Sequence, residues 1–289
     1  MRVLIAGCGY VGSALGVELA AAGHEVWGLR RGAAALPARI CPIHADLTDP
    51  SLPSMLPEGI GRVVYAASPA SPSDEGYART YVHGLTNLLR ALERRGAPVR
   101  RVLLTTSTAV YAQSDGAWVD ESSATEPTHS SGRRLLEGER VLAEGPFPGV
   151  AVRLAGIYGP GRDGLLRRVL EGRARCPERP RHSNRIHRDD CAGLLHHLLD
   201  HPRPHPVYIG VDDAPDDLGE VYRWVADRLG VPHPPRETSH ERDVGRRAPS
   251  NKRCRNGRLR ASGYRLRVPS YREGYLPLIE ALRASPSGS

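Results

Sequence analysis

The sequence predicts an α/β protein with a doubly wound parallel sheet and a smaller C-terminal lobe. Short apolar runs alternate along the chain with segments whose apolar residues recur at helical spacing. A glycine-rich string at residues 7–12 stands directly between the first apolar run and the first helical segment. The length of 289 residues is too great for a minimal domain and fits a large core with an added lobe. Strands that alternate with helices form parallel sheets with right-handed crossovers, which is the architecture we expect here.

The first strand is expected at residues 3–6, because a short continuous apolar run is typical of a strand buried on both faces. The first helix follows it, with apolar residues from 11 to 22 along one side and Gly23 at its end. We expect the second strand at residues 24–29. Further strands are expected at 63–67, 102–106 and 150–154, and a helix with a leucine face at 79–95.

The pattern loosens from about residue 156, where Pro, Arg and His become frequent. We therefore assign residues 1–155 to a core, to which residues 186–212 return, and residues 156–185 and 213–289 to the smaller lobe. The acidic turn at 212–217 precedes a helix predicted at 218–229, which it caps and whose dipole it complements. The tail at 284–289 is expected to fray.

The charge and cysteine content argue against several classes of protein. Forty Lys+Arg against 32 Asp+Glu give a net charge of +8, but the arginines are dispersed and form no nucleic-acid module, so we expect no nucleic-acid partner. The five cysteines are odd in number and widely spaced, which favours reduced thiols in a cytoplasm over disulfides or a metal site. No apolar stretch approaches the ~20 residues that span a bilayer. No signal peptide precedes the first strand, and we expect a cytoplasmic protein without a membrane partner.

The string Gly7-Cys8-Gly9-Tyr10-Val11-Gly12 has the G-x-G-x-x-G spacing of a dinucleotide-binding turn, in the expected place after a strand and before a helix. Gly7 permits the tight turn, Gly9 lets the backbone approach a diphosphate, and Gly12 allows the helix to pack closely on the strand. The helix N-terminus offers free N–H groups and partial positive charge to the anion. These features predict a Rossmann dinucleotide-binding core in residues 1–155.

Two arginines, Arg30 and Arg31, stand where the second strand is expected to end. In folds specific for NAD(H), an acid placed roughly 20 residues after the glycine-rich turn accepts a hydrogen bond from the ribose 2′-hydroxyl. Guanidinium groups cannot accept that bond, but they pair well with a 2′-phosphate. We therefore predict NADP(H) as the preferred cofactor, with NAD(H) as the alternative if both arginines face solvent.

Several further segments follow one another along the chain in a defined order. They are His44-Ala45-Asp46-Leu47, Tyr65-Ala66-Ala67-Ser68, and the segments 105–111 (TTSTAVY), 153–161 (RLAGIYGPG) and 185–190 (RIHRDD). In this order they resemble the motifs of the extended short-chain dehydrogenase/reductases, the group of NAD-dependent epimerases and dehydratases, over nearly the whole chain. Members of that family act largely on nucleotide sugars.

The resemblance implies roles for particular residues. The residues that would bind the dinucleotide with the three glycines are Tyr10, Val11, Asp46, Leu47, Ala66, Ala67 and Ser68. Ser107 would hydrogen-bond the reacting oxygen of the substrate, with Thr108 beside it, and Arg185 would contact the substrate where residues 185–190 tie the smaller lobe to the core. The resemblance also implies a homodimer through the helices at 79–95 and 132–142.

One part of the family pattern is missing. In the family, a Tyr-x-x-x-Lys pair on the helix after the fifth strand transfers the proton and holds the nicotinamide ribose. An alignment on Glu139 puts Ser131 and Leu135 in these two places, and a shift by one residue gives a serine and an arginine instead. The single lysine, Lys252, lies far downstream, and no Tyr-x-x-x-Lys occurs anywhere. The chain thus resembles atypical members that keep the cofactor fold without the standard pair.

Three residues are candidates to take over the chemistry. His129 stands two positions before the tyrosine slot and has a side chain of the type that serves as a general acid or base, although it could instead flank the cap of a helix. Tyr111 ends the strand-five motif, and its alternative is to pack in the core. Ser107 would polarise a carbonyl, and its alternative is a structural role at the end of a strand.

Arginine-rich segments in the C-terminal half leave two interpretations open. Arg253 belongs to the cationic segment 250–256, close in sequence to Arg246, Arg247 and Arg258. Facing a cleft, it would bind a carboxylate or a diphosphate of the substrate, and facing outward it would be part of a solvated basic surface. The same question applies to Arg162 and to the arginines at 167, 168, 173 and 175.

The sequence therefore favours an NADP(H)-binding oxidoreductase or epimerase-like enzyme of the extended short-chain type. Its substrate would be a small polar or anionic molecule, such as a sugar nucleotide, and its proton donor would be non-standard. The alternative is a non-catalytic protein that binds NADP(H) and responds to it.

Overall fold

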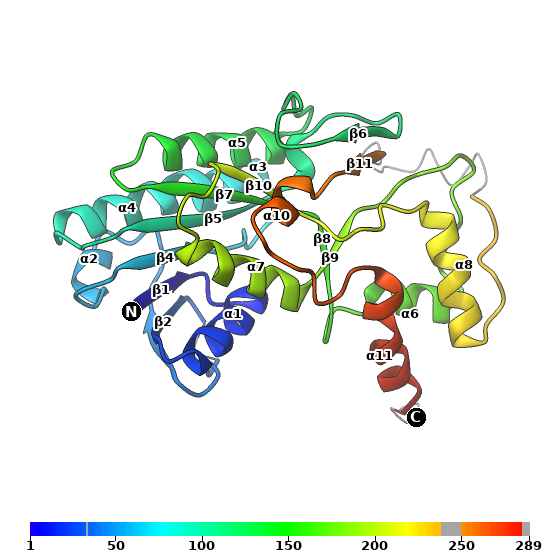
Figure 1. The fold of residues 1–289 in the computed structure, drawn as a ribbon, viewed down its shortest axis with the longest axis horizontal. Coiled ribbons are helices and arrows are strands. Elements are labelled where there is room, and N and C mark those ends of the chain that lie inside the picture. The colour runs from blue at the N-terminus through cyan, green and yellow to red at the C-terminus, as the bar shows by residue number, and fades with distance from the viewer. Residues whose placement is uncertain (33, 238–249, 285–289) are drawn as a thin grey trace.

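The computed structural model describes residues 1–289 except for 33, 238–249 and 285–289 (Figure 1). Its centre is a seven-stranded sheet in which all neighbouring strands are parallel, in the order β10-β7-β5-β4-β1-β2-β3. The strands are β1 (Arg2–Ala6), β2 (Glu25–Arg30), β3 (Ile40–His44), β4 (Arg62–Tyr65), β5 (Arg101–Ser107), β7 (Gly149–Leu154) and β10 (Val207–Gly210). The predicted doubly wound parallel sheet is thus confirmed, with β3 and β10 as strands that the sequence pattern did not identify.

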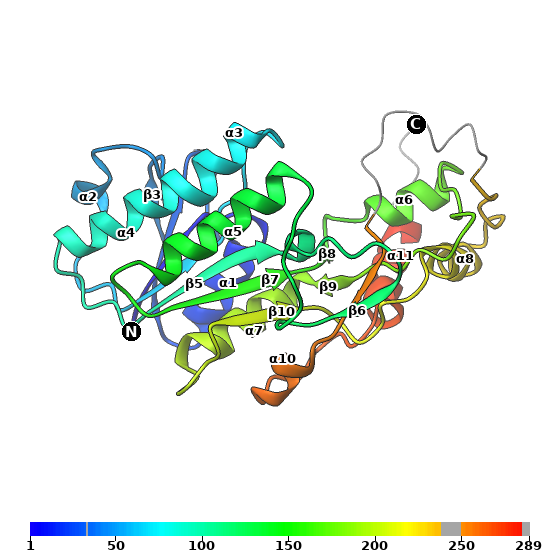
Figure 2. The ribbon, with the colours of Figure 1, turned by 90° about the horizontal axis from the view of Figure 1, so that it is seen from above.

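Two layers of helices cover the sheet (Figures 1 and 2). On one face lie α1 (Tyr10–Ala21) and α7 (Arg188–Asp200), and on the other α2 (Leu52–Met55), α4 (Leu85–Arg94) and α5 (Ser130–Ala143). Strand β1 shows why both layers form: Val3 and Ile5 pack in the cluster under α1 and α7, whereas Leu4 and Ala6 pack in the cluster under α4 and α5. Because side chains alternate across a strand, a continuous apolar run requires cover on both faces.

The helix predicted at 79–95 begins earlier, at Asp74. It consists of α3 (Asp74–Tyr77), the π-helical segment η1 (Ala78–Gly84) and α4. The Oγ of Ser73 caps its start by accepting a hydrogen bond from the N–H of Gly76 at 3.1 Å. Residues 74–77 bury no side chain, so the apolar periodicity that revealed α4 is absent from the first turn.

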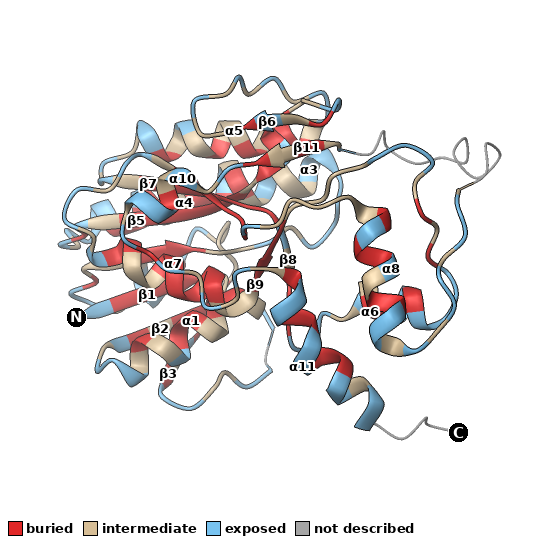
Figure 3. Ribbon diagram, turned by 45° about the vertical axis from the view of Figure 1, so that its right-hand side comes forward, coloured by how far each residue is buried: buried red, intermediate tan, exposed pale blue. Residues whose placement is uncertain are grey.

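The second lobe is built from α6 (Gly164–Leu170), α8 (Leu218–Leu229) and α11 (Tyr271–Ala284), which share a separate apolar cluster (Figure 3). Two small parallel sheets join the lobe to the core: β8 (Gly156–Tyr158) with β9 (Arg185–His187), and β6 (Ala117–Val119) with β11 (Lys252–Cys254). Helix α8 occupies the predicted range, and its N-cap residue is Asp217 from the acidic turn. Among the described residues, no helix combines the length and apolar character needed to cross a membrane.

The boundary placed at residue 213 needs a correction. Leu259 in α10 (Gly257–Ala261) and Tyr264 pack in the core cluster with α1 and α7, so this part of the C-terminal segment lies on the core. The buried Asp190 carboxylate fixes it there by accepting hydrogen bonds from the Tyr264 hydroxyl at 2.9 Å and from the N–H groups of Arg267 and Val268 at 2.7 and 2.9 Å. These contacts join positions far apart in sequence, which a composition change along the chain does not reveal.

Candidate functional site

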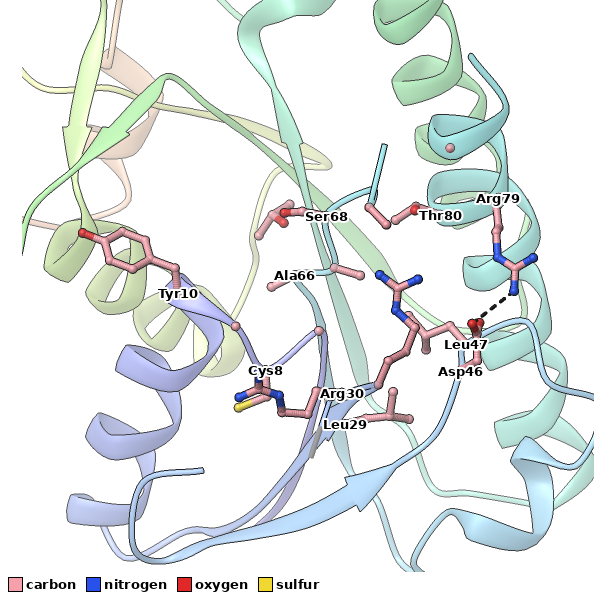
Figure 4. A pocket seen from close by; sticks show the side chains of 18 of the residues that line it. Cys8, Tyr10, Leu29, Arg30, Asp46, Leu47, Ala66, Ser68, Arg79 and Thr80 are labelled. Carbon is pink, nitrogen blue, oxygen red and sulfur yellow. Dashed lines mark hydrogen bonds and ion pairs between the residues drawn. The ribbon is translucent and has the colours of Figure 1, made fainter. Parts of the chain in front are cut away.

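A cavity of about 670 Å³ opens where the first strands of the sheet end, at their carboxyl edge (Figure 4). Ligands in open α/β sheets bind at this edge, where the order of the strands reverses. Most of the residues that were expected to bind the dinucleotide line this cavity: Gly7, Gly9, Tyr10, Val11, Arg30, Arg31, Asp46, Leu47, Ala66, Ala67 and Ser68. The tertiary structure thus brings segments from four different loops around one space.

Each of the three glycines in the turn is required for a different structural reason. Gly7 has a φ of +92°, and a Cβ atom there would lie 2.3 Å from the backbone of Ala67. A Cβ on Gly9 would have no protein atom within 4 Å, so its open side faces the cavity. Gly12 does not line the cavity. A Cβ there would lie 2.9 Å from the Ile5 side chain and 2.7 Å from the Gly7 carbonyl oxygen, so only glycine lets the helix pack this closely on the strand. The turn therefore combines a tight bend, an open approach and close helix–strand packing.

The first turn of α1 is left without any side-chain cap. The N-cap residue is Gly9, which has no side chain to accept hydrogen bonds from the free N–H groups of this turn, and no acidic residue stands in the turn. The first N–H groups of an α-helix have no partner inside the helix. These donors and the helix dipole make the part of the cavity next to the start of α1 suited to an anionic diphosphate.

One end of the cavity is bounded by Asp46 and Arg79, joined by an ion pair of 3.1 Å (Figure 4). Asp46 Oδ1 also accepts hydrogen bonds from the N–H and the hydroxyl of Thr48, at 2.9 and 2.8 Å. Burial acts to raise the pKa of Asp46, but the hydrogen bonds from Thr48 and Arg79 outweigh it and hold that pKa below its ordinary value. The carboxylate is therefore ionised and held in one orientation.

Arg30 and Arg31 line the same end of the cavity. Among the described residues, no carboxylate forms an ion pair with either guanidinium. Arg79, which comes from η1, adds a third arginine to this end of the cavity. Three arginines therefore line the cavity here with two acids, Asp46, which lies against Arg79, and Glu75.

Thr105 and Leu154 line the cavity from β5 and β7, and Ile157 and Arg162 line it from the segment that follows β7. Ser107 lies two residues after Thr105 on β5 and is half-buried, and because strand side chains alternate, both residues point to the same side of the strand. The Ser107 Oγ accepts a hydrogen bond from the N–H of Ala109 at 3.2 Å, which leaves its own hydrogen free to donate. Thr108 is buried in the turn that follows. Neither Ser107 nor Thr108 is among the lining residues of this cavity.

The two residues that the alignment on Glu139 puts in place of the family's tyrosine and lysine are buried in α5. Ser131 is 6 % exposed, and Leu135 is 1 % exposed and packs in the core cluster under α4 and α5. His129 is the N-cap residue of α5, and its side chain is exposed and makes no capping hydrogen bond. His129 does not line the cavity, so the geometry matches its alternative interpretation as a residue at the cap of the helix.

Tyr111 belongs to a buried polar network. Arg153 donates to the Tyr111 hydroxyl oxygen at 2.8 Å and to both carboxylate oxygens of Glu139, at 3.0 and 2.6 Å. The Thr106 hydroxyl donates to the same carboxylate at 2.9 Å. Burial raises the pKa of Tyr111 to about 12, although Arg153 opposes the shift. The network ties β5, β7 and α5 together, and Tyr111 packs in the core rather than lining the cavity.

Lys252 lies closer to the strand-five motif than its place in the sequence indicates. Its Nζ donates to the carbonyl oxygen of Tyr111 at 3.2 Å and to the Ser250 hydroxyl at 2.7 Å, and burial lowers its pKa. Arg253, expected to bind substrate, instead lies over the exposed Trp118 ring at 4.8 Å and donates to the carbonyl oxygen of Gly116. Its guanidinium is thus used within the joint of β6 and β11, outside the cavity. Arg246 and Arg247 lie outside the described residues.

Arg185 is 4 % exposed and lies beneath the second lobe. Its guanidinium donates to the Ser183 hydroxyl at 2.6 Å and lies 5.1 Å from the centre of the Tyr271 ring, while its Nη1 has no hydrogen-bond partner among the described residues. Asp212 is buried nearby, and its Oδ2 also lacks a partner within the described part of the chain. Burial raises the pKa of Asp212 to about 8, although the positive charge of Arg185 opposes the shift. This buried group lies in the joint between core and lobe and does not line the cavity.

Sequence reasoning missed three charged residues of the cavity wall, Glu75, Arg79 and Arg162. Arg79 stands in a segment predicted as an amphipathic helix, and nothing in its local pattern marks it. Arg162 follows the RLAGIYGPG segment and was one of several arginines with two open interpretations. The structure separates it from the arginines at 167 and 173, which pair with Asp163 and Glu171 on the surface of the second lobe.

Comparisons with known proteins agree with this geometry. Residues 3–210 match the model of the NAD dependent epimerase/dehydratase family. A solved structure from Methylobacillus flagellatus, assigned to the NAD-dependent epimerases/dehydratases, is 38% identical, covers 98% of both chains and has a TM-score of 0.80. The 3-diazoavenalumate denitrifying reductase of a Streptomyces species is 29% identical over 95% of this chain and 99% of its own. The structure of MoeE5 in complex with UDP-glucose and NAD is 25% identical, covers 99% of this chain and 100% of its own, and has a TM-score of 0.80.

Proposed function

The chain belongs to the NAD dependent epimerase/dehydratase family, and on this premise we propose that it is an oxidoreductase or epimerase-like enzyme that binds NADP(H) in preference to NAD(H). Its substrate is a small polar or anionic molecule that binds next to the nicotinamide at the β5 end of the cavity. The observation that carries the proposal is the cavity itself, in which the glycine-rich turn is followed by two arginines without carboxylate partners among the described residues.

The related proteins support a nicotinamide cofactor and a polar substrate. MoeE5 was crystallised with NAD and UDP-glucose, and the Streptomyces relative is a reductase. When bound, the nicotinamide group supplies or accepts a hydride. The protein has to position that group, exclude water and control a proton at the reacting oxygen of the substrate.

The preference for NADP(H) follows from the chemistry of Arg30 and Arg31. Each guanidinium can form charge-assisted hydrogen bonds to a 2′-phosphate, and neither can accept a hydrogen bond from a 2′-hydroxyl. Of the two acids that line the cavity, Asp46 is engaged by Thr48 and Arg79, and Glu75 is outnumbered by the arginines. A 2′-phosphate therefore meets a cationic end of the cavity.

Proton control requires a solution other than the usual pair, because the sequence contains no Tyr-x-x-x-Lys. Ser107 is the best-placed residue to hydrogen-bond the reacting oxygen, because it shares a side of β5 with Thr105 and retains a free hydroxyl hydrogen. A serine hydroxyl orients and polarises that oxygen but is a poor acid, so the proton comes from a solvent molecule or from the substrate itself.

The cofactor preference is tested by calorimetric titration of the wild type, Arg30→Ala and Arg31→Ala with NADPH and NADH. We expect tighter binding of NADPH by the wild type and a loss of about tenfold or more in NADPH affinity for each variant, because a hydrogen bond to a charged group contributes about 1.5–3 kcal/mol. NADH affinity should change little. Equal or tighter binding of NADH by the wild type would contradict the preference.

Catalysis is tested by following the stereospecific exchange of a deuterium label between NADPH and a panel of polar carbonyl compounds and sugar nucleotides. We expect label transfer to at least one compound, and a lower rate with unchanged cofactor affinity in Ser107→Ala. Tight NADPH binding without any exchange would instead favour the non-catalytic alternative, a protein that responds to NADP(H).

A further inference from the structure

The turn that leads from β8 into the second lobe places one charged side chain on the wall of the cofactor cavity. The N–H of Arg162 donates to the carbonyl oxygen of Gly159 at 2.9 Å, which closes a tight turn just before α6. Gly161 within this turn has a φ of +78°. The turn directs Arg162 toward the cavity, although the helix that follows belongs to the second lobe.

Tyr10 fixes the position of the Arg162 guanidinium. The carbon Cζ of Arg162 lies 4.2 Å from the centre of the Tyr10 ring, within the range of a cation–π contact. The Tyr10 hydroxyl in turn donates to the carbonyl oxygen of Pro160 at 3.0 Å, so that the ring and the turn hold each other. This contact orients the cation without neutralising it.

The charge of Arg162 remains available for a ligand. In the part of the chain that the structure describes, no carboxylate forms an ion pair with it, and its side chain is exposed. Arg188 offers a contrast, because its Cζ lies 5.4 Å from the same ring but its Nε is paired with Asp189 at 2.8 Å. Two guanidinium groups therefore lie near one tyrosine, and the one without an acidic partner lines the cavity.

Tyr10 is also the first residue of α1, the helix whose uncapped N–H groups face the cavity. The Arg162 cation is thus held against the side chain of the residue that begins this helix. We infer that Arg162 is a second phosphate-binding element, which binds the diphosphate of the dinucleotide from the second lobe while the glycine-rich turn binds it from the core. This inference rests on the proposed cofactor site and adds a residue and a lobe to it.

The arrangement couples cofactor binding to the second lobe. The helix N-terminus and the glycine-rich turn are parts of the core, whereas Arg162 belongs to the turn before α6. A bound diphosphate bridges the two. The stacking contact with Tyr10 pre-orders the guanidinium, so that less side-chain freedom is lost on binding.

The test compares Arg162→Ala with Arg168→Ala, an exposed arginine on α6 that does not line the cavity. The probes are NADPH, NADH and ADP-ribose, which contain the diphosphate, and adenosine 2′-monophosphate, which lacks it. We expect Arg162→Ala to weaken the three diphosphate ligands by about tenfold each, since each loses a hydrogen bond to a charged group. Binding of adenosine 2′-monophosphate should be unchanged, and Arg168→Ala should match the wild type with all four probes.

A second measurement follows amide hydrogen exchange with and without ADP-ribose. We expect added protection at residues 159–164 in the wild type and none there in Arg162→Ala. Unchanged affinity of Arg162→Ala for all diphosphate ligands would overturn the inference, and so would a variant whose only defect is a higher KM for the substrate, because Arg162 would then bind substrate. If the wild type binds none of the dinucleotides, the proposed function fails instead, whatever Arg162 does.

Discussion

The two ends of the same sheet edge use their polar groups in opposite ways. At the glycine-rich turn, the N–H groups of α1 and the side chains of Arg30, Arg31 and Arg162 line an open cavity, and none of these arginines pairs with a carboxylate of the described residues. In the network of β5, β7 and α5, and where Lys252 meets the strand-five motif, the polar groups are buried and engaged with other protein groups. Arg153 bonds Glu139 and Tyr111, and Lys252 bonds a carbonyl and a hydroxyl.

The difference teaches how to separate a ligand site from a structural network in a chain rich in arginine. A charged group without a protein partner is stable at a water-filled cavity, where solvent or a ligand takes its hydrogen bonds. A charged group inside the protein needs its partners from the protein itself, because an unpaired buried charge is strongly destabilising. The first kind of arginine predicts a ligand, and the second kind predicts stability.

The largest expected effect comes from breaking the buried network. Glu139→Ala leaves Arg153 buried without its carboxylate and should lower the free energy of unfolding by about 3–5 kcal/mol, measured by urea denaturation. Glu137→Ala in the same helix is the control, because Glu137 forms a half-exposed pair with Arg134, whose loss should cost about 1 kcal/mol or less. Similar effects of the two variants would contradict the distinction between the networks.

The cofactor end is broken by a bulkier residue at Gly9. Gly9→Val should lower NADPH affinity about a hundredfold, or about 2.7 kcal/mol, because its side chain occupies the space where the diphosphate approaches the backbone. The thermal stability without ligand should change little, since a Cβ at Gly9 meets no protein atom within 4 Å. Gly7→Ala is the matched variant, and it should lose stability as well, because a Cβ there lies 2.3 Å from Ala67.

The pH dependence of the free energy of unfolding tests the state of Asp212 in the buried joint between core and lobe. Its pKa is raised to about 8 in the folded protein, so the folded state keeps a proton that the unfolded state releases at lower pH. The stability contributed by the protonated group is therefore lost as pH rises toward 8. Relative to Asp212→Asn, the wild type should lose about 2 kcal/mol between pH 6 and pH 8, at roughly 1 kcal/mol per pH unit. Parallel pH profiles in urea denaturation would show that the carboxyl is already ionised at pH 6.

The smallest effect is expected at Tyr111. Tyr111→Phe removes one hydrogen bond from the buried network and should lower the free energy of unfolding by about 1 kcal/mol. NADPH affinity and the rate of label exchange should stay at the wild-type level. A large loss of exchange with normal stability would instead restore Tyr111 as a candidate proton donor.

Local patterns predicted those parts of the fold and the site that local chemistry determines. The apolar run before Gly7, the helical spacing after Gly12 and the acidic turn before α8 each act within a few residues, and the structure has the expected elements at these places. Strand β3 was missed because Pro42 and polar neighbours interrupt its apolar pattern, and β10 because its short apolar run directly follows the Pro/His-rich stretch 201–206. The start of the helix at Asp74 was missed because its first turn buries no side chain.

The sequence by itself therefore determined the doubly wound sheet, the dinucleotide-binding turn and the absence of the Tyr-x-x-x-Lys pair. Each depends on residues that are adjacent or separated by a fixed short spacing. Only the tertiary structure decided which arginines line the cavity, that Tyr111 and Arg185 are buried, and that Lys252 lies against the strand-five motif. These facts depend on side chains that converge from distant segments, and the burial that determines their hydrogen-bond partners and pKa values exists only once the chain has folded.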